Sequence, residues 1–112
     1  QAVLNIARNA AQALIGADTP DPEIRFKTRI ARNVILARER YRLALELHIQ
    51  DNGPGIPEAI RDRIFYPLVS GREGGSGLGL TLAQTFVQQH HGTIECESRP
   101  GLTDFRILLP LP

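Results

Sequence analysis

The feature that most constrains the fold is a regular alternation of apolar and polar residues over residues 41–50. Apolar side chains occupy every second position from Tyr41 to Ile49, and most positions between them are charged or polar. A period of two is typical of a β-strand with one buried face and one face in water. Residues 24–30 alternate in the same way, so the two runs predict a β-hairpin with a polar tip near residues 37–40.

A helical pattern precedes this hairpin. Apolar residues recur at three- and four-residue spacing from Val3 to Leu14, and Gly16 with the following ADTPDPE ends the helix. After the hairpin comes the turn cluster DNGPGIP, residues 51–57, in which Pro57 opens a short helix.

The second half of the chain predicts one more helix and two strands. The helix runs from Leu78 to about His91, with Gly92 as its C′ residue. Its inward-facing side chains are predicted to be Leu82, Phe86 and Val87. Two short strands, 93–98 and 103–109, are joined by a Pro-Gly turn.

These elements predict an α+β fold in one small domain of 112 residues. We expect a two-layer sandwich, with helices packed on one face of a mixed, largely antiparallel sheet. The chain lacks methionine and starts inside a helical pattern without an N-cap, so we expect it to be part of a longer protein.

Composition excludes some classes of function. A net charge of +1 gives no global field that favours nucleic acid or an anionic membrane. No apolar run approaches the roughly 20 residues of a membrane helix. The single cysteine, Cys96, cannot form an internal disulfide, which suits the cytoplasm.

The stretch SGREGGSGLGL, residues 70–80, places five glycines directly before the second long helix. A helix N-terminus with glycines around it can bind phosphate through backbone N–H groups. A Walker A loop is excluded because the only lysine, Lys27, lies in a predicted strand, and a dinucleotide fingerprint is excluded because no strand precedes the glycines. Taken alone, the glycines favour a flexible loop that binds nothing.

Two further segments favour a nucleotide. Asn5 and Asn9 lie four residues apart on one helix face, and an Asn amide oxygen is a suitable Mg²⁺ ligand, although an exposed polar face would give the same pattern. Asp51 ends a strand and could accept a hydrogen bond from an adenine amino group, with Gly55 letting the ring lie close. A simple turn is the alternative there.

Four segments in this order resemble the ATP-binding catalytic domain of sensor histidine kinases, a Bergerat-type fold shared with gyrase, heat-shock 90 and mismatch-repair ATPases. NIARNAAQAL is similar to the N box, DNGPGIP to the G1 box, IFYPLVSG to the F box and GSGLGL to the G2 box. The resemblance covers residues 1 to about 109.

The resemblance assigns roles to particular residues. Asn9 is the expected Mg²⁺ ligand, Asn5 lines the phosphate side, and Asp51 holds the adenine amino group. Residues from about 65 to 77 form the expected ATP lid. Its Arg72 is a candidate for reaching the β/γ-phosphates, with a solvated loop arginine as the alternative, and Arg8 is the other basic candidate. The expected cofactor-binding set is Asn9, Asp51, Gly53, Gly55, Ile56, Phe65, Gly75, Ser76, Gly77, Leu78 and Gly79.

Position 5 separates a kinase from an ATPase. Hydrolysing relatives carry a Glu four residues before the Mg²⁺ ligand, where this chain has Asn5, and an amide is not a usable general base. The resemblance therefore implies ATP binding without efficient hydrolysis and transfer of the γ-phosphoryl group to a histidine of another domain. A gyrase-type ATPase, an anti-sigma-type serine kinase and a nucleotide-sensing module remain alternatives.

The lid and the segment RERYRLAL further resemble nitrogen-regulatory sensor kinases. This resemblance implies a cytoplasmic homodimer with its own dimerisation and phosphoacceptor domain, a response regulator and a small trimeric nitrogen-signalling protein as partners. We expect the histidines of this chain to be structural. The arginines of residues 25–42 are either a solvated sheet face or a docking surface for an acidic partner, with direct nucleic-acid binding disfavoured.

Overall fold

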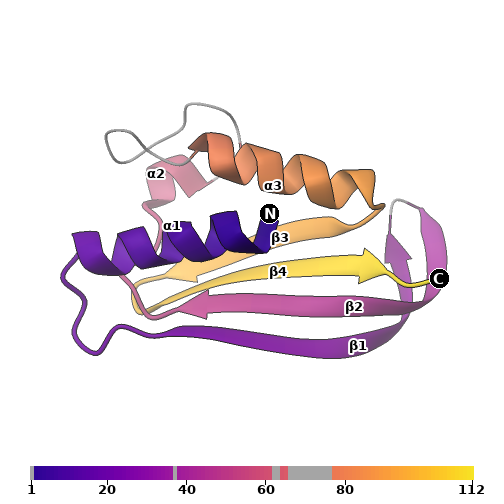
Figure 1. Ribbon diagram of the computed structural model, residues 1–112, viewed down its shortest axis with the longest axis horizontal. Coiled ribbons are helices and arrows are strands. Elements are labelled where there is room, and N and C mark those ends of the chain that lie inside the picture. The colour runs from indigo at the N-terminus through magenta and orange to yellow at the C-terminus, as the bar shows by residue number, and fades with distance from the viewer. Residues whose placement is uncertain (1, 37, 62–63, 66–76) are drawn as a thin grey trace.

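The computed structural model describes residues 2–36, 38–61, 64–65 and 77–112. Its elements are α1 (Ala2–Gly16), β1 (Ile24–Leu36), β2 (Glu39–Asp51), α2 (Glu58–Arg61), α3 (Gly77–Gln89), β3 (Thr93–Arg99) and β4 (Leu102–Pro110). The four strands of these described residues form one sheet in the order β1-β2-β4-β3, and every neighbouring pair is antiparallel. Figure 1 shows α1 and α3 side by side on one face of the sheet. The predicted two-layer α+β sandwich is confirmed.

The predicted hairpin is confirmed as β1 and β2. They pair from Ile24 opposite Asp51 to Leu36 opposite Glu39. The turn includes Arg38 in the left-handed region, with φ of 67°. Because β1 begins opposite the end of β2, the chain segment that leaves α1 lies next to Asp51.

The core lies between the sheet and the two long helices. Its buried members come from α1, β2, α3, β4 and the segment after α2, and they are Ile6, Ile49, Ile64, Leu80, Ala83, Val87, Phe105 and Ile107. Ile6 precedes Asn9 by about one helical turn, and Ile49 precedes Asp51 by one strand period. Packing of the two isoleucines therefore fixes the elements that carry the two polar side chains.

The inward face of α3 differs from the prediction. Val87 is buried as expected, but Leu82 and Phe86 are 55% and 40% exposed. The buried stripe instead contains Leu80 and Ala83, which also follow helical spacing with Val87. The helix carries two apolar stripes, and the one that contains Ala83 is buried. The small Ala83 side chain lets α3 approach its neighbours closely on that side.

The end of α3 is also one residue away from the prediction. His91, not Gly92, adopts the left-handed conformation, with φ of 64°. The N–H of Gly92 donates to the carbonyl of Val87 at 2.9 Å, which makes Gly92 the C″ residue of a Schellman-type cap. Glycine is required there for another reason, because a Cβ would lie 2.2 Å from the carbonyl oxygen of Leu108.

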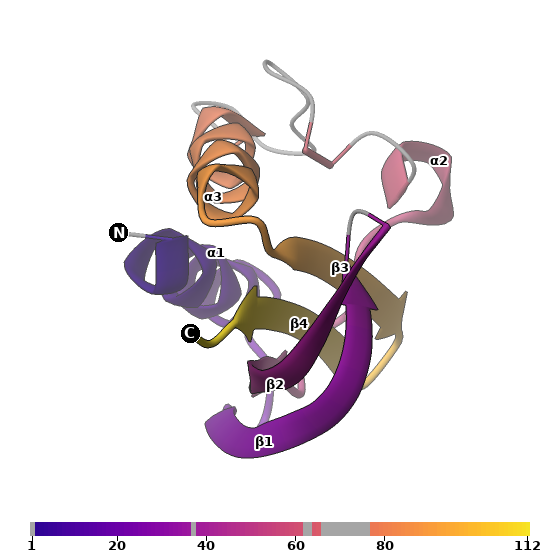
Figure 2. The same cartoon turned by 90° about the vertical axis from the view of Figure 1, so that its right-hand side faces the viewer.

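Burial along the hairpin is uneven. Figure 2 shows β1 at the edge of the curved sheet that is farthest from α3. Its inward-phase residues Phe26 and Ile30 are accordingly 52% and 51% exposed, although the alternation predicted their burial. On the opposite face, Glu46 of β2 is buried rather than in water.

Among the described residues, no helix has the length and apolar character needed to cross a bilayer.

Candidate functional site

Asn9 presents a buried side chain whose polar atoms have no partner. It lies on α1, is 9% exposed, and neither Nδ2 nor Oδ1 makes a hydrogen bond within the described part of the chain. Leaving a buried polar group unpaired costs about 1–3 kcal/mol, so such a group calls for an explanation. Asn5 lies one turn earlier on α1 and is half-buried. The two asparagines thus share one face of the helix, as predicted.

Asp51 is the second buried polar residue on this side of the sheet. It ends β2, is 7% exposed, and its Oδ1 accepts a hydrogen bond from the N–H of Gly53 at 2.9 Å. Burial raises the pKa of the Asp51 carboxyl, and the Gly53 N–H partly opposes that shift. This is the one hydrogen bond to the carboxylate among the described residues, where Oδ2 has no donor.

The loop after Asp51 packs closely against its surroundings. A Cβ on Gly53 would lie 2.9 Å from Oδ1 of Asp51 and 3.3 Å from Cδ2 of Leu14, so the loop passes against the end of α1. Gly55 has φ of 88°, and a Cβ there would lie 2.8 Å from the carbonyl carbon and oxygen of Arg99. The fold therefore requires glycine at position 55, whereas a Cβ at position 53 would displace only the ends of the Asp51 and Leu14 side chains. Contact of either glycine with a nucleotide stays a prediction.

Ile56 and Phe65 extend this wall beyond the glycines. Both pack against the core cluster, and the N–H of Ile56 donates to Oγ of Ser98 at 2.7 Å. The Phe65 ring meets Phe105 edge-on, with ring centroids 6.3 Å apart. The hydroxyl of Thr81 donates to the carbonyl of Phe65, which ties this segment to α3.

The remaining predicted residues belong to the region before α3 and to its start. Gly77, Leu78 and Gly79 form the first turn of α3, where backbone N–H groups lack intrahelical partners and attract anions. Arg72, Gly75 and Ser76 lie outside the described residues. Leu80 and Ile6 belong to one buried cluster, so the start of α3 lies against the same helix as Asn9.

Three polar residues near Asp51 were not predicted. Thr103 is directly opposite Asp51 in the sheet and 4% exposed, and its hydroxyl lies 2.8 Å from that of Ser98. Arg61 donates from Nη2 to the carbonyl of Ile56 at 3.1 Å. Ser98 and Thr103 occupy strand positions in phase with buried apolar residues, as Asp51 does. A polar residue at a strand position where the alternation predicts an apolar one was the sequence signal that could have identified Ser98 and Thr103.

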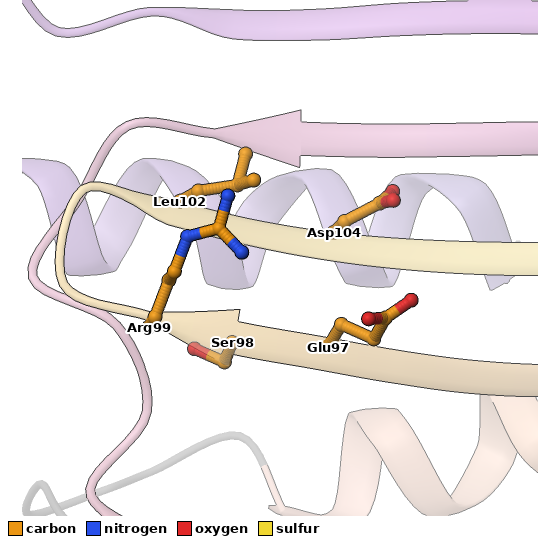
Figure 3. Close-up of a pocket in the computed structure, with 5 residues that line it drawn as sticks. All are labelled: Glu97, Ser98, Arg99, Leu102 and Asp104. Atoms are coloured by element: carbon orange, nitrogen blue, oxygen red, sulfur yellow. The ribbon is translucent and has the colours of Figure 1, made fainter.

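A hollow of about 240 Å³ lies on the face of the sheet away from α1, and neither Asn9 nor Asp51 lines it. Figure 3 shows its lining, with the side chains of Glu97 and Asp104 next to each other on β3 and β4 and with α1 behind the sheet. The other lining residues are Ser98, Arg99 and Leu102. Within the described ranges, no cluster of three or more His, Cys, Asp or Glu residues is arranged to hold a metal ion.

A charged cluster also occupies this outer face. His48 Nε2 lies 2.6 Å from Oε2 of Glu46, and His48 Nδ1 lies 3.0 Å from Oδ1 of Asp104. Arg29 donates from Nε to Oε2 of Glu46 at 3.0 Å. Hydrogen bonds from Arg29 and His48 lower the pKa of Glu46, and the hydrogen bond to Glu46 is the main cause of the raised pKa of His48.

Comparison with known proteins identifies the class. All of residues 1–112 match the family described as histidine kinase-, DNA gyrase B- and HSP90-like ATPase, and the chain belongs to this family. The chain is 51% identical over 111 residues to the sensory histidine kinase/phosphatase NtrB of Salmonella typhimurium, which covers 99% of this chain and 31% of that protein. It is 40% identical over 114 residues to NtrB of Rhizobium leguminosarum bv. phaseoli, covering 98% and 29%. The chain therefore spans about a third of the length of these relatives.

Solved structures agree with this assignment. A mycobacterial sensor histidine kinase, MprB, superposes with a TM-score of 0.70 at 29% identity, over 97% of this chain and 69% of that one. The catalytic domain of histidine kinase ThkA gives 0.68 at 23% identity, over 97% and 66%, which supports the fold. The predicted resemblance is confirmed, and the chain is an ATP-binding catalytic domain of the histidine kinase class.

Proposed function

We propose that residues 1–112 form one catalytic domain that binds Mg-ATP and donates the γ-phosphoryl group to a histidine on a separate dimerisation domain of the same protein. Transfer would leave ADP on this domain and a phosphohistidine on the acceptor. The domain's contribution is to position the nucleotide and balance its charge, which dominates catalysis of phosphoryl transfer.

The observation that carries this proposal is the unpartnered side chain of Asn9. Its amide oxygen suits Mg²⁺, which takes few protein ligands and otherwise binds phosphates and water. The bound ion would neutralise part of the phosphate charge. Asn9 would hold the ion, Asn5 and the first turn of α3 would face the phosphates, and the open Oδ2 of Asp51 would accept from the adenine amino group.

An amide instead of a carboxylate at position 5 supports a kinase over an ATPase. Asn5 occupies the position where hydrolysing relatives have Glu, and an amide cannot accept a proton from water at neutral pH. Fixing ATP without activating water preserves the phosphoryl group for the acceptor histidine. Arg72 is the proposed basic residue for the β/γ-phosphates, with Arg8 as the other candidate.

The wider context follows from the resemblance to nitrogen-regulatory sensor kinases. We infer a cytoplasmic homodimer that phosphorylates a response regulator in nitrogen regulation and responds to a small trimeric signalling protein. The identity to NtrB over nearly the whole chain supports this context. The proposed nucleotide contacts leave the outer sheet face free for such partners.

A phosphotransfer assay tests the function directly. The chain is incubated with Mg-ATP labelled at the γ-phosphate and with the dimerisation domain of the protein that carries it. We expect acid-labile, base-stable label on a histidine of that domain. Intact ATP binding without any transfer would favour the nucleotide-sensing module and overturn the proposal.

Substitution at position 5 separates the two enzyme classes. Asn5→Glu should raise ATP hydrolysis about 10-fold or more, which is below the roughly 10²–10⁴-fold of an optimised general base because the water is not optimally placed. Gln88→Glu, which adds the same charge on the exposed face of α3, is the control. Rapid hydrolysis by the unmodified chain would contradict the kinase assignment.

A further inference from the structure

The backbone of Ile56 is held by side chains from two other elements. Its N–H donates to Oγ of Ser98 on β3 at 2.7 Å, and its carbonyl accepts from Nη2 of Arg61 on α2 at 3.1 Å. A loop peptide normally bonds to water or to its own turn. Here both polar groups of one peptide position are committed to side chains that are 5 and 42 residues away in sequence.

The Ser98 hydroxyl also reaches toward Asp51 through Thr103. Oγ of Ser98 lies 2.8 Å from Oγ1 of Thr103, and Thr103 is opposite Asp51 in the β2–β4 register. A hydroxyl has two acceptor lone pairs and one donor. Ser98 can therefore accept from Ile56 and donate to Thr103 at once, which links the loop to the strand position beside the carboxylate.

The end of β3 contacts this loop through the backbone as well. The N–H of Gly101 donates to the carbonyl of Gly53 at 2.9 Å, and the missing Cβ of Gly55 leaves room for the backbone of Arg99. These contacts fix the distance between the loop and the β3–β4 turn. Among the described residues, the Ser98 hydroxyl is the one group that accepts from the Ile56 N–H.

From this arrangement we propose that Ser98 is a positioning residue for base recognition: its hydroxyl fixes the Gly55–Ile56 backbone and the Thr103 hydroxyl relative to Asp51, and so sets the preference for adenine. This inference rests on the proposed nucleotide site. Ser98 acts through Ile56 and Thr103 and does not itself need to touch the base.

Binding of ATP and GTP tests the role. Adenine carries at C6 the amino group from which Asp51 would accept, whereas guanine carries a carbonyl oxygen there. In the purified protein with Mg²⁺, Ser98→Ala should weaken ATP binding about five- to tenfold, the effect of one hydrogen bond. Weak GTP binding should stay unchanged, so the preference for ATP falls by the same factor. Ser98→Thr keeps the hydroxyl and should retain ATP affinity within about twofold.

A control and a second readout separate positioning from general stability. Thr85→Ala removes a hydroxyl whose one hydrogen bond among the described residues goes to the carbonyl of Thr81 on α3, and it should change neither affinity. Hydrogen exchange of the Ile56 amide, without nucleotide, should accelerate about 10-fold in Ser98→Ala and not in Thr85→Ala.

Each outcome decides the matter. Equal weakening of ATP and GTP, or unchanged ATP binding, in Ser98→Ala would overturn the positioning role and leave the proposed function intact. Failure of the unmodified protein to bind either nucleotide would remove the proposed function together with this inference. An Ile56 amide that exchanges equally in all variants would show that the hydrogen bond does not hold the loop.

Discussion

Buried polar groups occupy both faces of the sheet, and their partners differ. On the outer face, Glu46 is buried but is bonded by Arg29 and His48, and His48 is in turn bonded by Asp104. On the helix-facing side, the amide of Asn9 has no partner among the described residues. A polar cluster that satisfies itself stabilises the fold, whereas one that stays unsatisfied is a place for a ligand.

Asn9→Ala should have the largest effect and should separate binding from stability. Mg-dependent ATP binding should fall at least about 100-fold, because losing a direct ligand exceeds the roughly 10–100-fold cost of losing an outer partner. The free energy of unfolding should stay the same or rise by about 1 kcal/mol, since an unpaired buried amide is removed and alanine favours helix. Calorimetric titration and denaturant unfolding measure both.

Gln88→Ala, an exposed amide on α3, is the matched control and should leave ATP affinity unchanged. If Asn9→Ala instead lowered the free energy of unfolding and left Mg-ATP affinity unchanged, Asn9 would belong with the structural cluster and the contrast between the two faces would be lost.

Asp51→Asn should give the next largest effect. The Gly53 N–H can still donate to the side-chain oxygen, but a charge-assisted bond to the adenine amino group is lost, so ATP affinity should fall about 10–100-fold. Burial raises the pKa of Asp51, so the buried carboxylate lowers the stability of the fold above that pKa. The free energy of unfolding therefore rises as the pH falls through the raised pKa. The neutral variant should therefore unfold at the same or a higher temperature at neutral pH.

The Asp51 pKa also predicts a pH dependence of binding. Because the pKa is raised, the accepting carboxylate of wild type is lost at a higher pH than an ordinary Asp would be, and ATP affinity should decline as the pH falls through that range. The variant should lack this decline. Identical pH profiles for both proteins would count against Asp51 as the acceptor.

Glu46→Gln tests the outer cluster and should lower stability without lowering ATP affinity, which is the opposite of Asn9→Ala. Losing the charge that partners Arg29 and His48 should lower the free energy of unfolding by about 1 kcal/mol. ATP affinity should stay within about twofold. Glu95→Gln, at an exposed ion pair with Arg106, is the control and should cost about 0–0.5 kcal/mol. Loss of ATP binding in Glu46→Gln would show that the two faces are coupled.

The smallest effect concerns His48 and pH. Its pKa is raised, so its stabilising contribution is complete below the usual histidine value and is lost as the pH rises through the raised value. His48→Gln should therefore destabilise the chain more at about pH 5.5 than at about pH 9. Thermal unfolding at both values measures this, and a difference that grows with pH would refute the charged state of His48.

Local pattern was sufficient for the elements and for part of the site. The hairpin followed from period two, the helices from their apolar spacing, and the two-layer arrangement from their combination. Asn9 and Asp51 were named from motif order, and the structure buries both on the helix-facing side. Their roles toward Mg²⁺ and adenine stay predictions, as do those of Arg72, Gly75 and Ser76.

Other features depend on segments that are distant in sequence. Ser98 and Thr103 become neighbours of Ile56 and Asp51 through strand register and loop packing, which no local pattern encodes. Ser98 and Thr103 are polar residues at strand positions that otherwise carry apolar side chains, and this pattern alone does not predict their partners. The same applies to Arg61, whose partner is chosen by the path of the loop.

The sequence by itself determined which segments are helices and strands, because backbone propensity and side-chain period act over a few residues. Tertiary structure decided which apolar faces are covered: β1 lies at the sheet edge, so Phe26 is exposed, and α3 presents Leu80 instead of Leu82. Tertiary packing also makes glycine necessary at position 92, because a Cβ there would clash with the carbonyl oxygen of Leu108. Burial and close approach are properties of pairs of elements, and they arise only when those elements pack.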